Sequence, residues 1–571
     1  MQYELIAKYD FNPFDPNFVR NVIFRNRNVE PSMDFLAPTK GNLYNYELLH
    51  NLKRGSDLIN KHKENNIFLV VDSDVDGYTS AAIFYNYLKK MHPNINIEWM
   101  VHEGKEHGVT VDKVPVDTDL LVLIDAGSNQ LEEHEILSAK GMNILVIDHH
   151  ETEKESEHAV IINNQLSPNY PNKRLSGAGV MYKFATALDD YYGQHYADYF
   201  LDLAALGIIA DMMEVNNLEN RFIITEGLKN VNNPFFNALI QKQQFSLGSQ
   251  PLNSIGVMFY IAPLINALIR VGTMEEKELM FNAFINGDQL IPSTKRGSSA
   301  GEQETVAAQA ARICANAKSR QKKIVDQLQG NIEEIIHQEG LLDDPVLIVK
   351  LPEADNRNII GLAANQVAHK HQKPTLVLVS DDKGAYSGSG RNFQTSEIDN
   401  FKDILNESSF FEFAEGHQSA FGAKIKEENI DKFMEFADTI FNDQFISDIY
   451  FVDFLFKGND LQVDIIKEIV KFQSLWGKGF DEPYIAVTDL SISPLKFTFM
   501  GKGKNHLKFE HNNIAYIFFN INTEKFRSLM NNVVFDIVGR CSINVWNGRI
   551  TYQIIVKDYT MKESEDKGFA I

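Results

Sequence analysis

The hydrophobic positions of the first half of the chain fall into short apolar runs separated by segments of helical periodicity. Between residues 46 and 150 the apolar runs cover residues 67–71, 95–101, 120–124 and 144–147, and amphipathic segments reach Lys63 and extend from Thr79 to Met91. Short runs rich in β-branched residues that end at Asp or Gly are typical of buried parallel strands. Their alternation with helices predicts an α/β domain with a largely parallel sheet.

Acidic and imidazole side chains follow three of these predicted strands directly. They are Asp72, Asp74 and Asp76 after the first run, Asp125 after LLVLI, and Asp148, His149 and His150 after ILVI. The carboxyl ends of parallel strands open into one crevice, where ligands bind. We therefore expect these side chains to meet at one edge of the sheet. Taken alone, the three aspartates of the first turn fit a solvated acidic turn that caps the next helix equally well.

Two further segments are candidates for the same edge. An apolar, helix-like run from Leu203 ends at Asp211, an acid that by itself is more often a helix terminus than a ligand. The small residues of SGAGV, at 176–180, stand at a predicted helix start. They permit either close approach of the backbone to a phosphate or tight packing, and packing is the slightly better interpretation.

The residue types at this edge indicate a metal site for phosphoryl chemistry. Neighbouring carboxylates repel one another unless a cation or proton offsets their charge, and hard oxygen ligands suit Mg²⁺ or Mn²⁺. Imidazole ligands shift the preference toward Mn²⁺. Two ions about 3.5 to 4 Å apart stabilise both the attacking and the leaving oxygen of an in-line displacement. Beside these acids, His149 and His150 are predicted to bind metal and phosphate, although a histidine pair is usually structural.

The sequence predicts an irregular N-terminal arm at 1–45, followed by the acid-bearing α/β domain at 46–295. Three further parts follow that domain. A helix-forming stretch predicts a connecting helix within 296–340. The runs VLIVK and PTLVLVS predict a second α/β domain at 341–445, with two small-residue turns, GSGR at 388–391 and EGHQSAFG at 415–422, whose amides suit phosphate.

Strand-like runs dominate the last part, residues 446–571. Asn547 and Gly548 predict a hairpin between the final two runs. Five or six strands in about 110 residues suggest a small β-barrel of the oligonucleotide-binding type. Aromatic and cationic residues alternate between Lys502 and Lys508, which suits stacking and phosphate contact with a single strand. A barrel that only closes a cleft is the alternative.

Net charge, cysteine content and the length of the apolar runs argue against several classes of protein. The 571 residues carry a net charge of −22, which argues against binding of duplex nucleic acid through overall charge. Two cysteines without CxxC spacing support neither a disulfide framework nor a thiolate zinc site. The N-terminus lacks signal-peptide character, and no run of about 18 apolar residues occurs. We expect a soluble cytoplasmic protein that makes no membrane contact.

The motifs together resemble a known superfamily. DSDVDG at 72–77, LIDAG around Asp125, DHH at 148–150 and ALGIIAD ending at Asp211 resemble, in order, the four motifs of the DHH phosphoesterases. SGAGV, IAPLINALIRVG at 261–272, GSGR, EGH and the terminal FDIVGRCSINVWNGR extend the resemblance to RecJ-type exonucleases specific for single-stranded DNA. The resemblance covers nearly the whole chain from about Arg25, and it makes 46–295 the DHH catalytic domain and 341–445 the DHH-associated domain.

This resemblance implies a 5′ to 3′ exonuclease that uses two Mn²⁺ or Mg²⁺ ions to release mononucleotides from single-stranded DNA. Asp74 would bind one metal, Asp76 and His149 the other, with Asp125 bridging and Asp211 completing the shell. Asp72 and Asp148 would support these ligands. The resemblance implies substrate contacts for His150, Asn266, Arg270, Ser389, Arg391 and His417.

The sequence departs from the family at three places. Glu415 precedes Gly416 where the family has a glycine pair, and the arginine expected after Pro263 is missing. HEGKEHGVT, at 102–110, replaces a segment with an arginine and a GYG turn, so Lys105 is taken as the substitute contact for a 5′-phosphate.

Alternative functions remain open at the level of sequence. One is a DHH phosphodiesterase for very short oligonucleotides or cyclic dinucleotides, although these generally lack a terminal barrel. The other is a catalytically silent replication scaffold, against which the complete acid set argues, because unpaired clustered carboxylates are costly without metal. For the exonuclease we expect a monomer, with a helicase or a single-strand-binding protein as candidate partner.

Overall fold

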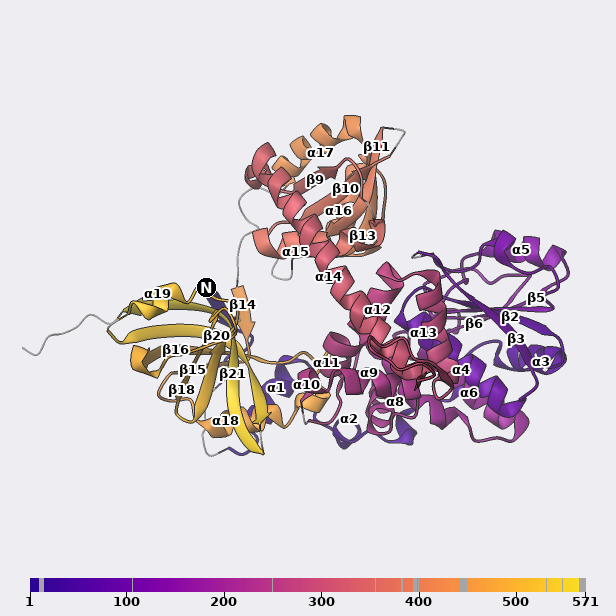
Figure 1. Cartoon of the computed structure of the whole chain (residues 1–571), viewed down its shortest axis with the longest axis horizontal. Helices are drawn as coiled ribbons and strands as arrows, with labels where there is room; N and C mark the ends of the chain where they lie inside the picture. The colour runs from indigo at the N-terminus through magenta and orange to yellow at the C-terminus, as the bar shows by residue number, and fades with distance from the viewer. Residues whose placement is uncertain are drawn as a thin grey trace, which may run out of the picture. The chain divides into compact units, whose positions relative to one another are not determined.

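The chain forms two compact units in the computed structural model (Figure 1). One unit holds residues 5–316 and 452–571, and the other holds residues 1–4 and 317–451. The structure describes residues 1–9, 15–104, 106–248, 250–354, 356–381, 384–393, 398, 400–440, 449–529, 531–546 and 548–563.

A five-stranded sheet forms the centre of the first unit, and all its strands are parallel. Its order is β3-β2-β4-β5-β6, with β2 (Asn66–Val71), β3 (Asn96–Val101), β4 (Leu120–Ile124), β5 (Asn143–Asp148) and β6 (Val160–Asn163). Strand β4 is buried at every position, as expected when helices cover both faces of a parallel sheet. The predicted α/β domain is confirmed. The four-residue β6 was missed because its apolar run is too short to stand out.

Helices accompany this sheet along the chain (Figure 1). The first five are α3 (Leu52–His62), α4 (Val75–Met91), α5 (Leu131–Ala139), α6 (Gly177–Tyr192) and α7 (Leu201–Ala210). The next six are α8 (Leu218–Lys229), α9 (Pro234–Lys242), α10 (Gln244–Leu247), α11 (Ser254–Gly256), α12 (Ala262–Val271) and α13 (Met274–Asn286). Of these helices, α3, α4, α5, α6 and α13 contact strands of the sheet. Helix α4 begins four residues before the predicted Thr79, because the Asp74 side chain caps it.

A nearly continuous helical stretch, Ser254–Val271, is apolar and long enough to cross a membrane by length and composition. It includes a π-helical turn, Val257–Ile261, between α11 and α12. Half of the stretch is buried within the protein. Partial burial of this kind is typical of a core helix in a globular domain.

The second unit begins within the long helix α14 (Val306–Glu339), whose 34 residues span about 51 Å. Ile332 and Ile336 of this helix pack on a sheet through Leu347, Val349 and Val377. The sheet order is β12-β13-β11-β10-β9, with β9 (Leu347–Leu351), β10 (Thr375–Ser380), β11 (Ala385–Arg391), β12 (Phe411–His417) and β13 (Ala420–Lys426). Its other helices are α15 (Ile360–His371), α16 (Phe401–Ser408) and α17 (Glu427–Ile440).

The prediction that GSGR forms a phosphate-binding turn is wrong. Residues 388–391 lie inside β11, which pairs with β10 on one side and β13 on the other, so their backbone groups belong to the sheet. A Cβ added to Gly388 would lie 2.0 Å from the carbonyl oxygen of Val377. The lack of a side chain at Gly388 therefore allows β11 and β10 to lie close together.

The C-terminal part of the first unit is a seven-stranded sheet. Its order is β15-β16-β20-β21-β19-β18-β17, with β15 (Phe454–Lys457), β16 (Tyr484–Ile492), β17 (Thr498–Met500), β18 (His506–His511), β19 (Ile514–Phe518), β20 (Val533–Trp546) and β21 (Arg549–Glu563). Helices α18 (Val463–Val470) and α19 (Glu524–Arg527) accompany it. Phe509, Phe518 and Phe535 pack their rings together in its interior. Trp546 pairs with Arg549 in the predicted hairpin, whose Asn547 lies outside the described residues.

The N-terminal segment is more regular than expected and packs on the C-terminal sheet domain. It contains α1 (Phe18–Asn26), α2 (Met33–Leu36) and β1 (Gln2–Leu5), which pairs with β14 (Ile449–Val452). The ring of Phe24 lies 5.1 Å from that of Phe480, and Arg27 forms a buried ion pair of 2.8 Å with Asp453. The contacts of Phe24 and Arg27 lie within the first unit and tie its N-terminal segment to the sheet domain, whereas β1 and β14 fall mostly in the second unit.

Candidate active site

The turn between β2 and α4 places three aspartates at the carboxyl edge of the parallel sheet. Asp72 follows the strand and is 1% exposed. Asp74 is the N-cap of α4 and accepts a hydrogen bond from the Gly77 amide at 2.9 Å. Asp76 lies in the first helical turn and is also 1% exposed. The three acids therefore have different surroundings despite their even spacing.

The start of α6 holds the carboxylate of Asp76. Ser176 Oγ, the Gly177 amide and the Ala178 amide donate to it at 2.9, 2.6 and 3.1 Å. A helix N-terminus favours negative charge, so these donors stabilise the ionised acid. The small residues of SGAGV therefore allow close approach to a carboxylate of the protein itself. This agrees with the interpretation that they serve tight packing, which the sequence slightly favoured over phosphate binding.

The start of α6 also lies close to a second aspartate, Asp125. A Cβ added to Gly177 would lie 2.4 Å from Asp125 Oδ1. Asp125 itself has a φ of +63°, a left-handed conformation that costs energy in a residue other than glycine. Its amide donates to the Ile147 carbonyl at 2.8 Å, which fixes the end of β4 beside the end of β5. The strained backbone turns the carboxylate into the cluster.

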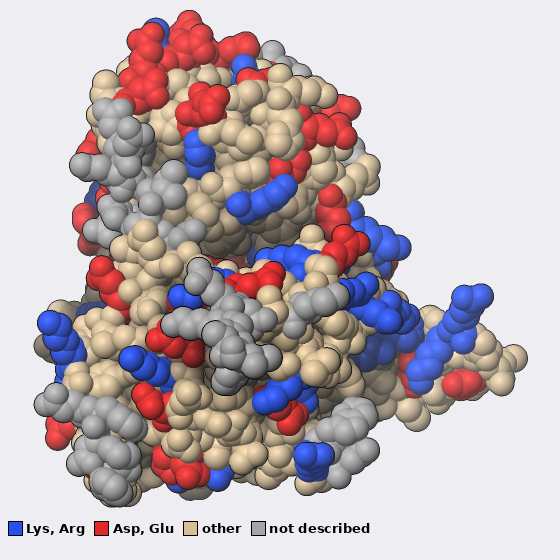
Figure 2. Space-filling model, turned by 90° about the vertical axis from the view of Figure 1, so that its left-hand side faces the viewer, with Lys and Arg blue, Asp and Glu red and all other residues tan. Residues whose placement is uncertain are grey.

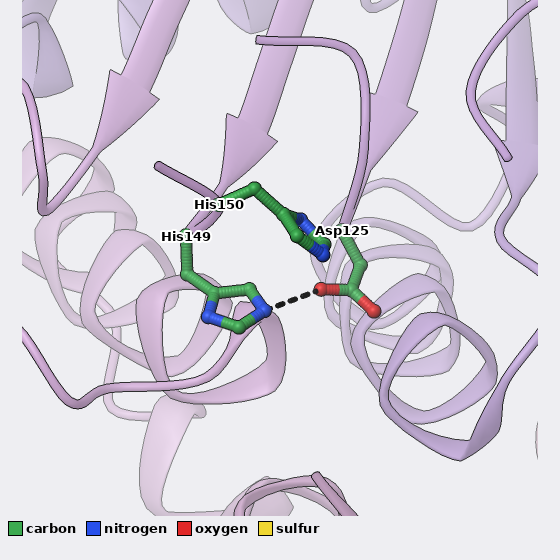
Figure 3. Close-up of side chains that lie close together, drawn as sticks. All are labelled: Asp125, His149 and His150. Atoms are coloured by element: carbon green, nitrogen blue, oxygen red, sulfur yellow. Dashed lines mark ion pairs between the residues drawn. The ribbon is translucent and has the colours of Figure 1, made fainter. Parts of the chain in front are cut away.

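His149 joins the acids of three separate segments. Its Nε2 lies 3.3 Å from Asp125 Oδ1, 3.5 Å from Asp211 Oδ2 and 4.0 Å from Asp76 Oδ2. Figure 3 shows His149 and Asp125 pointing toward each other from the ends of neighbouring strands, with His150 beside them. Asp211 is the C-cap of α7, so the helix-terminal acid does reach the cluster.

Asp148 organises the two histidines and does not join the cluster directly. It accepts hydrogen bonds from the Ser128 amide at 3.0 Å and the His149 amide at 2.7 Å. Its Oδ1 also lies 2.8 Å from His150 Nδ1. Burial raises the pKa of Asp148, but the hydrogen bond and charge of His150 outweigh it and lower the pKa overall. The same hydrogen bond raises the pKa of His150 to about 9.

His107 is a site residue that sequence reasoning missed. Its Nδ1 lies 2.7 Å from Asp72 Oδ2, and the adjacent Gly108 amide donates to Asp72 Oδ1 at 3.1 Å. The hydrogen bond with Asp72 raises the pKa of His107. The only available signal was an imidazole in HEGKEHGVT, which lacks any periodicity. Lys105, the predicted phosphate contact in that segment, lies outside the described residues.

The donor set fits divalent metal ions. Among the residues that the structure describes, Asp125 Oδ1 and Asp211 Oδ2 are buried without a hydrogen-bond partner. Burial and the neighbouring charge of Asp76 raise the pKa of both carboxyl groups, that of Asp211 to about 8. Such mutual destabilisation is relieved by a cation. Three groups of ligand atoms lie within 4.8 Å of one another: Asp125, His149 and His150; Asp76, His149 and Asp211; and Asp72, Asp74 and Asp125.

A pocket of about 200 Å³ opens above these ligands. Acids form one part of its lining, and Asn266 and Arg270 of α12 form another part together with His107. Burial lowers the pKa of Arg270. The structure thus brings the two predicted residues of α12 to the cluster.

The predicted substrate residues of the second unit lie together on its sheet. Ser389 and Arg391 belong to β11, and His417 ends β12, with β13 between these two strands. A Cβ added to Gly361 would lie 2.3 Å from Arg391 Nη2 and 3.2 Å from Ser389 Oγ, so both side chains lie beside the start of α15. Gly416 follows Glu415, the residue that differs from the family's glycine pair. Its φ of +130° requires glycine.

Family models match three parts of the chain. The N-terminal domain of the DHH family matches residues 66–208, the DHHA1 domain matches residues 343–443, and the RecJ OB domain matches residues 452–558. The order of these matches is that of the fold described above.

Relatives match over nearly the whole chain. YorK from the SPbeta prophage of Bacillus subtilis strain 168, provisionally named a single-strand DNA-specific exonuclease, is 39% identical over 99% of each chain. The single-stranded-DNA-specific exonuclease RecJ of B. subtilis is 25% identical over 93% of this chain and 66% of its own length.

Solved structures agree with the fold. RecJ from Thermus thermophilus in complex with Mn²⁺ has a TM-score of 0.72, at 19% identity, over 96% of this chain and 76% of its own. The complex of the same protein with Mg²⁺ has a TM-score of 0.66 at 18% identity, over 96% and 75%. From its motifs, its domain order and its 39% identical relative, the chain belongs to the DHH phosphoesterase family, among the RecJ-type enzymes.

Proposed function

We propose that this chain is a metal-dependent 5′ to 3′ exonuclease that hydrolyses phosphodiester bonds in single-stranded DNA and releases mononucleotides. The observation that carries the proposal is the convergence of Asp76, Asp125 and Asp211 on His149 Nε2 within 4.0 Å. Relatives named as exonucleases specific for single-stranded DNA support the substrate class.

Two metal ions have separate ligand groups available. In our assignment Asp74 holds one ion, Asp76 and His149 hold the other, Asp125 bridges them and Asp211 completes the shell. The groups Asp76, His149, Asp211 and Asp72, Asp74, Asp125 support this division. Bound ions would neutralise phosphate charge and lower the pKa of an attacking water. Asp72 and Asp148 orient His107 and His150, since each accepts from an imidazole Nδ1.

Side chains in and near the pocket are suited to the phosphate of the substrate: His107, Asn266 and Arg270 line it, and the ring of His150 lies 4.5 Å from that of His149. His150 and His107 each have Nδ1 engaged with a buried aspartate, so only Nε2 is left for the substrate. Arg270 and Asn266 add a cation and an amide. These groups would position the scissile phosphate against the ligands and bind negative charge that develops during hydrolysis. We also assign substrate phosphate contacts to Ser389, Arg391 and His417 of the second unit.

The setting of the enzyme is part of the same proposal. We assign a monomer as its working state. Both cysteines are buried and free, which suits the reducing cytoplasm. A helicase or a single-strand-binding protein would supply or hold the single strand. We retain 1–45, 46–295, 296–340, 341–445 and 446–571 as the limits of the functional parts.

The test uses one long single strand labelled at either end. With Mn²⁺ present, the 5′ label should appear at once as a mononucleotide, while the 3′-labelled strand shortens progressively. Asp125→Asn and His149→Ala should reduce both rates by about 1,000-fold or more, because each removes a shared ligand. Thermal unfolding of the variants, compared with the parent protein, checks that they remain folded.

The outcomes separate the proposal from its competitors. Release of the 3′ label first would reverse the assigned direction. An intact long strand together with cleavage of dinucleotides would identify a phosphodiesterase for short oligonucleotides or cyclic dinucleotides. Intact DNA of both kinds and no metal in elemental analysis would identify a catalytically silent scaffold.

A further inference from the structure

The helical stretch Ser254–Val271 connects two pockets of the first unit. Asn266 and Arg270, near its C-terminal end, line the catalytic pocket. Asn253, immediately before its N-terminal end, lines a second pocket of about 460 Å³. At 1.5 Å per residue the 18 residues cover about 27 Å. The stretch therefore offers a continuous surface from one pocket to the other.

The second pocket lies where the catalytic part meets the C-terminal sheet domain. Lys467, Lys471 and Tyr552 of the sheet domain line it opposite Asn253. The Gln473 side chain donates to that of Gln250 at 3.1 Å, which joins the two walls. Lys467 Nζ lies 5.7 Å from the centre of the Tyr552 ring. Cations beside an aromatic ring form the kind of surface that holds a nucleic-acid strand.

Between the two pockets the stretch exposes large aromatic side chains. Phe259 is 57% exposed and Tyr260 is 41% exposed. Both lie in the π-helical turn Val257–Ile261, a feature that often occurs at functional sites. The opposite side of the turn is anchored by Val257 and Ile261, which are fully buried. The aromatic pair is thus held on a rigid support and presented to solvent.

The outward positions continue toward the catalytic pocket. Phe259, Pro263, Asn266 and Arg270 are separated by four, three and four residues, the spacing of one helical face. None of them is buried, whereas Leu264, Ile265 and Leu268 on the other face are. We call Phe259, Tyr260, Pro263, Asn266 and Arg270 the outer face. It begins with aromatic rings and ends with an amide and a guanidinium in the catalytic pocket.

The charge of the protein argues for a local nucleic-acid path of this kind. The net charge of −22 opposes binding over a broad surface. Figure 2 shows one larger group of Lys and Arg side chains to the right of centre on the face drawn and single ones elsewhere. Lys467 and Lys471 pair with the exposed acids Asp464 and Glu468. Exposed pairs are weak, so a phosphate can compete for these cations.

We propose that the part of the single strand not yet hydrolysed runs along the outer face, with its bases stacked on Phe259 and Tyr260. The strand leaves the catalytic pocket past Arg270 and Asn266 and reaches the pocket of Lys467, Lys471 and Tyr552. Stacking on aromatic rings accepts every base, as a nuclease that degrades whatever sequence it meets requires. At about 3.4 Å per stacked nucleotide, the path holds about eight nucleotides. This inference rests on the proposed exonuclease activity.

Substrate length is the variable that tests this path. The double variant Phe259→Ala/Tyr260→Ala should lower kcat/KM about tenfold or more on a 20-nucleotide strand, because both stacking platforms are lost. On a dinucleotide, whose stacked length of about 7 Å is shorter than the roughly 9 Å between Asn266 and Tyr260 along the helix, kcat/KM should stay within about twofold. Phe259→Trp/Tyr260→Phe should restore most of the activity on the 20-nucleotide strand, because it restores two rings.

The matched control is Tyr191→Ala. Tyr191 is also 41% exposed, but it lies 15 residues along α6 from Ser176, about 22 Å from the end that contacts Asp76. This variant should leave the dependence on length unchanged.

A second measurement does not depend on hydrolysis. A 20-nucleotide strand that carries 2-aminopurine about five nucleotides from its 5′ end is bound in EDTA, and its fluorescence is followed. The parent protein should quench the fluorescence through stacking, and the double alanine variant should lose that quenching. Quenching without hydrolysis in Mn²⁺ would refute the proposed function and leave the binding path standing.

Other results would overturn the path itself. Unchanged kcat/KM on the 20-nucleotide strand would show that the aromatic pair does not contact DNA. An equal loss on both substrates would show that the pair supports the active site and not the strand. Dissociation of a parent oligomer by the double variant, with kinetics unchanged, would assign the outer face to a second copy of the chain.

Discussion

His107 Nδ1 lies 2.7 Å from Oδ2 of the buried Asp72, and His150 Nδ1 lies 2.8 Å from Oδ1 of the buried Asp148. Both pairs join an imidazole to a carboxylate. Their aspartates lie at the carboxyl ends of different strands, Asp72 after β2 and Asp148 at the end of β5. In each pair the aspartate fixes the orientation of the imidazole and raises its pKa. The contact supports our proposal that Asp72 orients its neighbours, and its partner His107 was not predicted from the sequence.

Replacement of His107 tests this relationship. His107→Gln should lower kcat/KM on a 5′-phosphorylated decamer about 10- to 100-fold, since a hydrogen bond to a charged group contributes about 1.5 to 3 kcal/mol. His195→Gln, a change at an exposed histidine, is the control and should have no effect. An unchanged rate for His107→Gln would remove His107 from the substrate contacts.

Gly177 is expected to tolerate no side chain. In Gly177→Ala the new Cβ would lie 2.4 Å from Asp125 Oδ1, so the ligand or the start of α6 has to shift. Activity and Mn²⁺ affinity should both fall about tenfold or more in steady-state assays and calorimetry. Gly330→Ala, in α14 at a position where no atom of the described residues lies within 4 Å of the new Cβ, should instead stabilise the helix by about 1 kcal/mol. Normal Mn²⁺ affinity in Gly177→Ala would contradict the described geometry.

Metal binding should depend on pH. Without metal, burial and the charge of Asp74 raise the pKa of Asp76 to about 7, and burial and the charge of Asp76 raise that of Asp211 to about 8. Below these values protons compete with the ion, so the Kd for Mn²⁺ should increase about 10- to 100-fold from about pH 8.5 to about pH 6.5. Calorimetry in buffers of different ionisation enthalpy should detect proton release. Asp211→Asn should flatten the dependence, and an unaltered slope would count against Asp211 as a ligand.

Fold stability should depend on His134 under mildly acidic conditions. Burial lowers the pKa of His134 to about 4, and neither ring nitrogen has a hydrogen-bond partner within the described parts of the chain. The unfolded chain binds a proton at this residue below about pH 6.5 and the folded chain does not, so stability falls as the pH decreases from about 6.5 toward about 4. His134 should account for about 2 kcal/mol of the loss between about pH 7.5 and about pH 5. In urea unfolding with EDTA, the free energy of unfolding of His134→Leu should fall by about 2 kcal/mol less than that of the parent protein between about pH 7.5 and about pH 5. The control His195→Leu should show the same fall as the parent protein.

The attachment of the N-terminal segment should depend on Asp453. The side chains of Arg27 and Asp453 are 9% and 2% exposed, and Asn26 Nδ2 also donates to Asp453. Asp453→Ala leaves a buried guanidinium without its partner and should lower the free energy of unfolding by about 3 to 5 kcal/mol. Asp326→Ala breaks an exposed pair with Lys322 and should cost less than about 0.5 kcal/mol. Equal losses in the two variants would argue against the buried pair.

Much of the candidate site could be predicted from local sequence. The runs at 67–71, 120–124 and 144–147 became β2, β4 and β5 with bounds within one residue, because buried parallel strands are continuous apolar segments. Parallel pairing then brought Asp125 and His149 together, since the ends of parallel strands lie at one edge. The spacing of acids after strands was therefore sufficient to predict that these acids and His149 lie together.

Contacts between irregular segments could not be predicted in this way. His107 meets Asp72 from a loop without periodicity, Arg27 meets Asp453 across 426 residues, and GSGR proved to be strand and not turn because two neighbouring strands pair with it. Local pattern decides which segments become strands and helices, since it reflects burial on one or both faces. Only tertiary packing decides which loop side chain reaches a buried carboxylate, because that depends on distances between segments that no local pattern encodes.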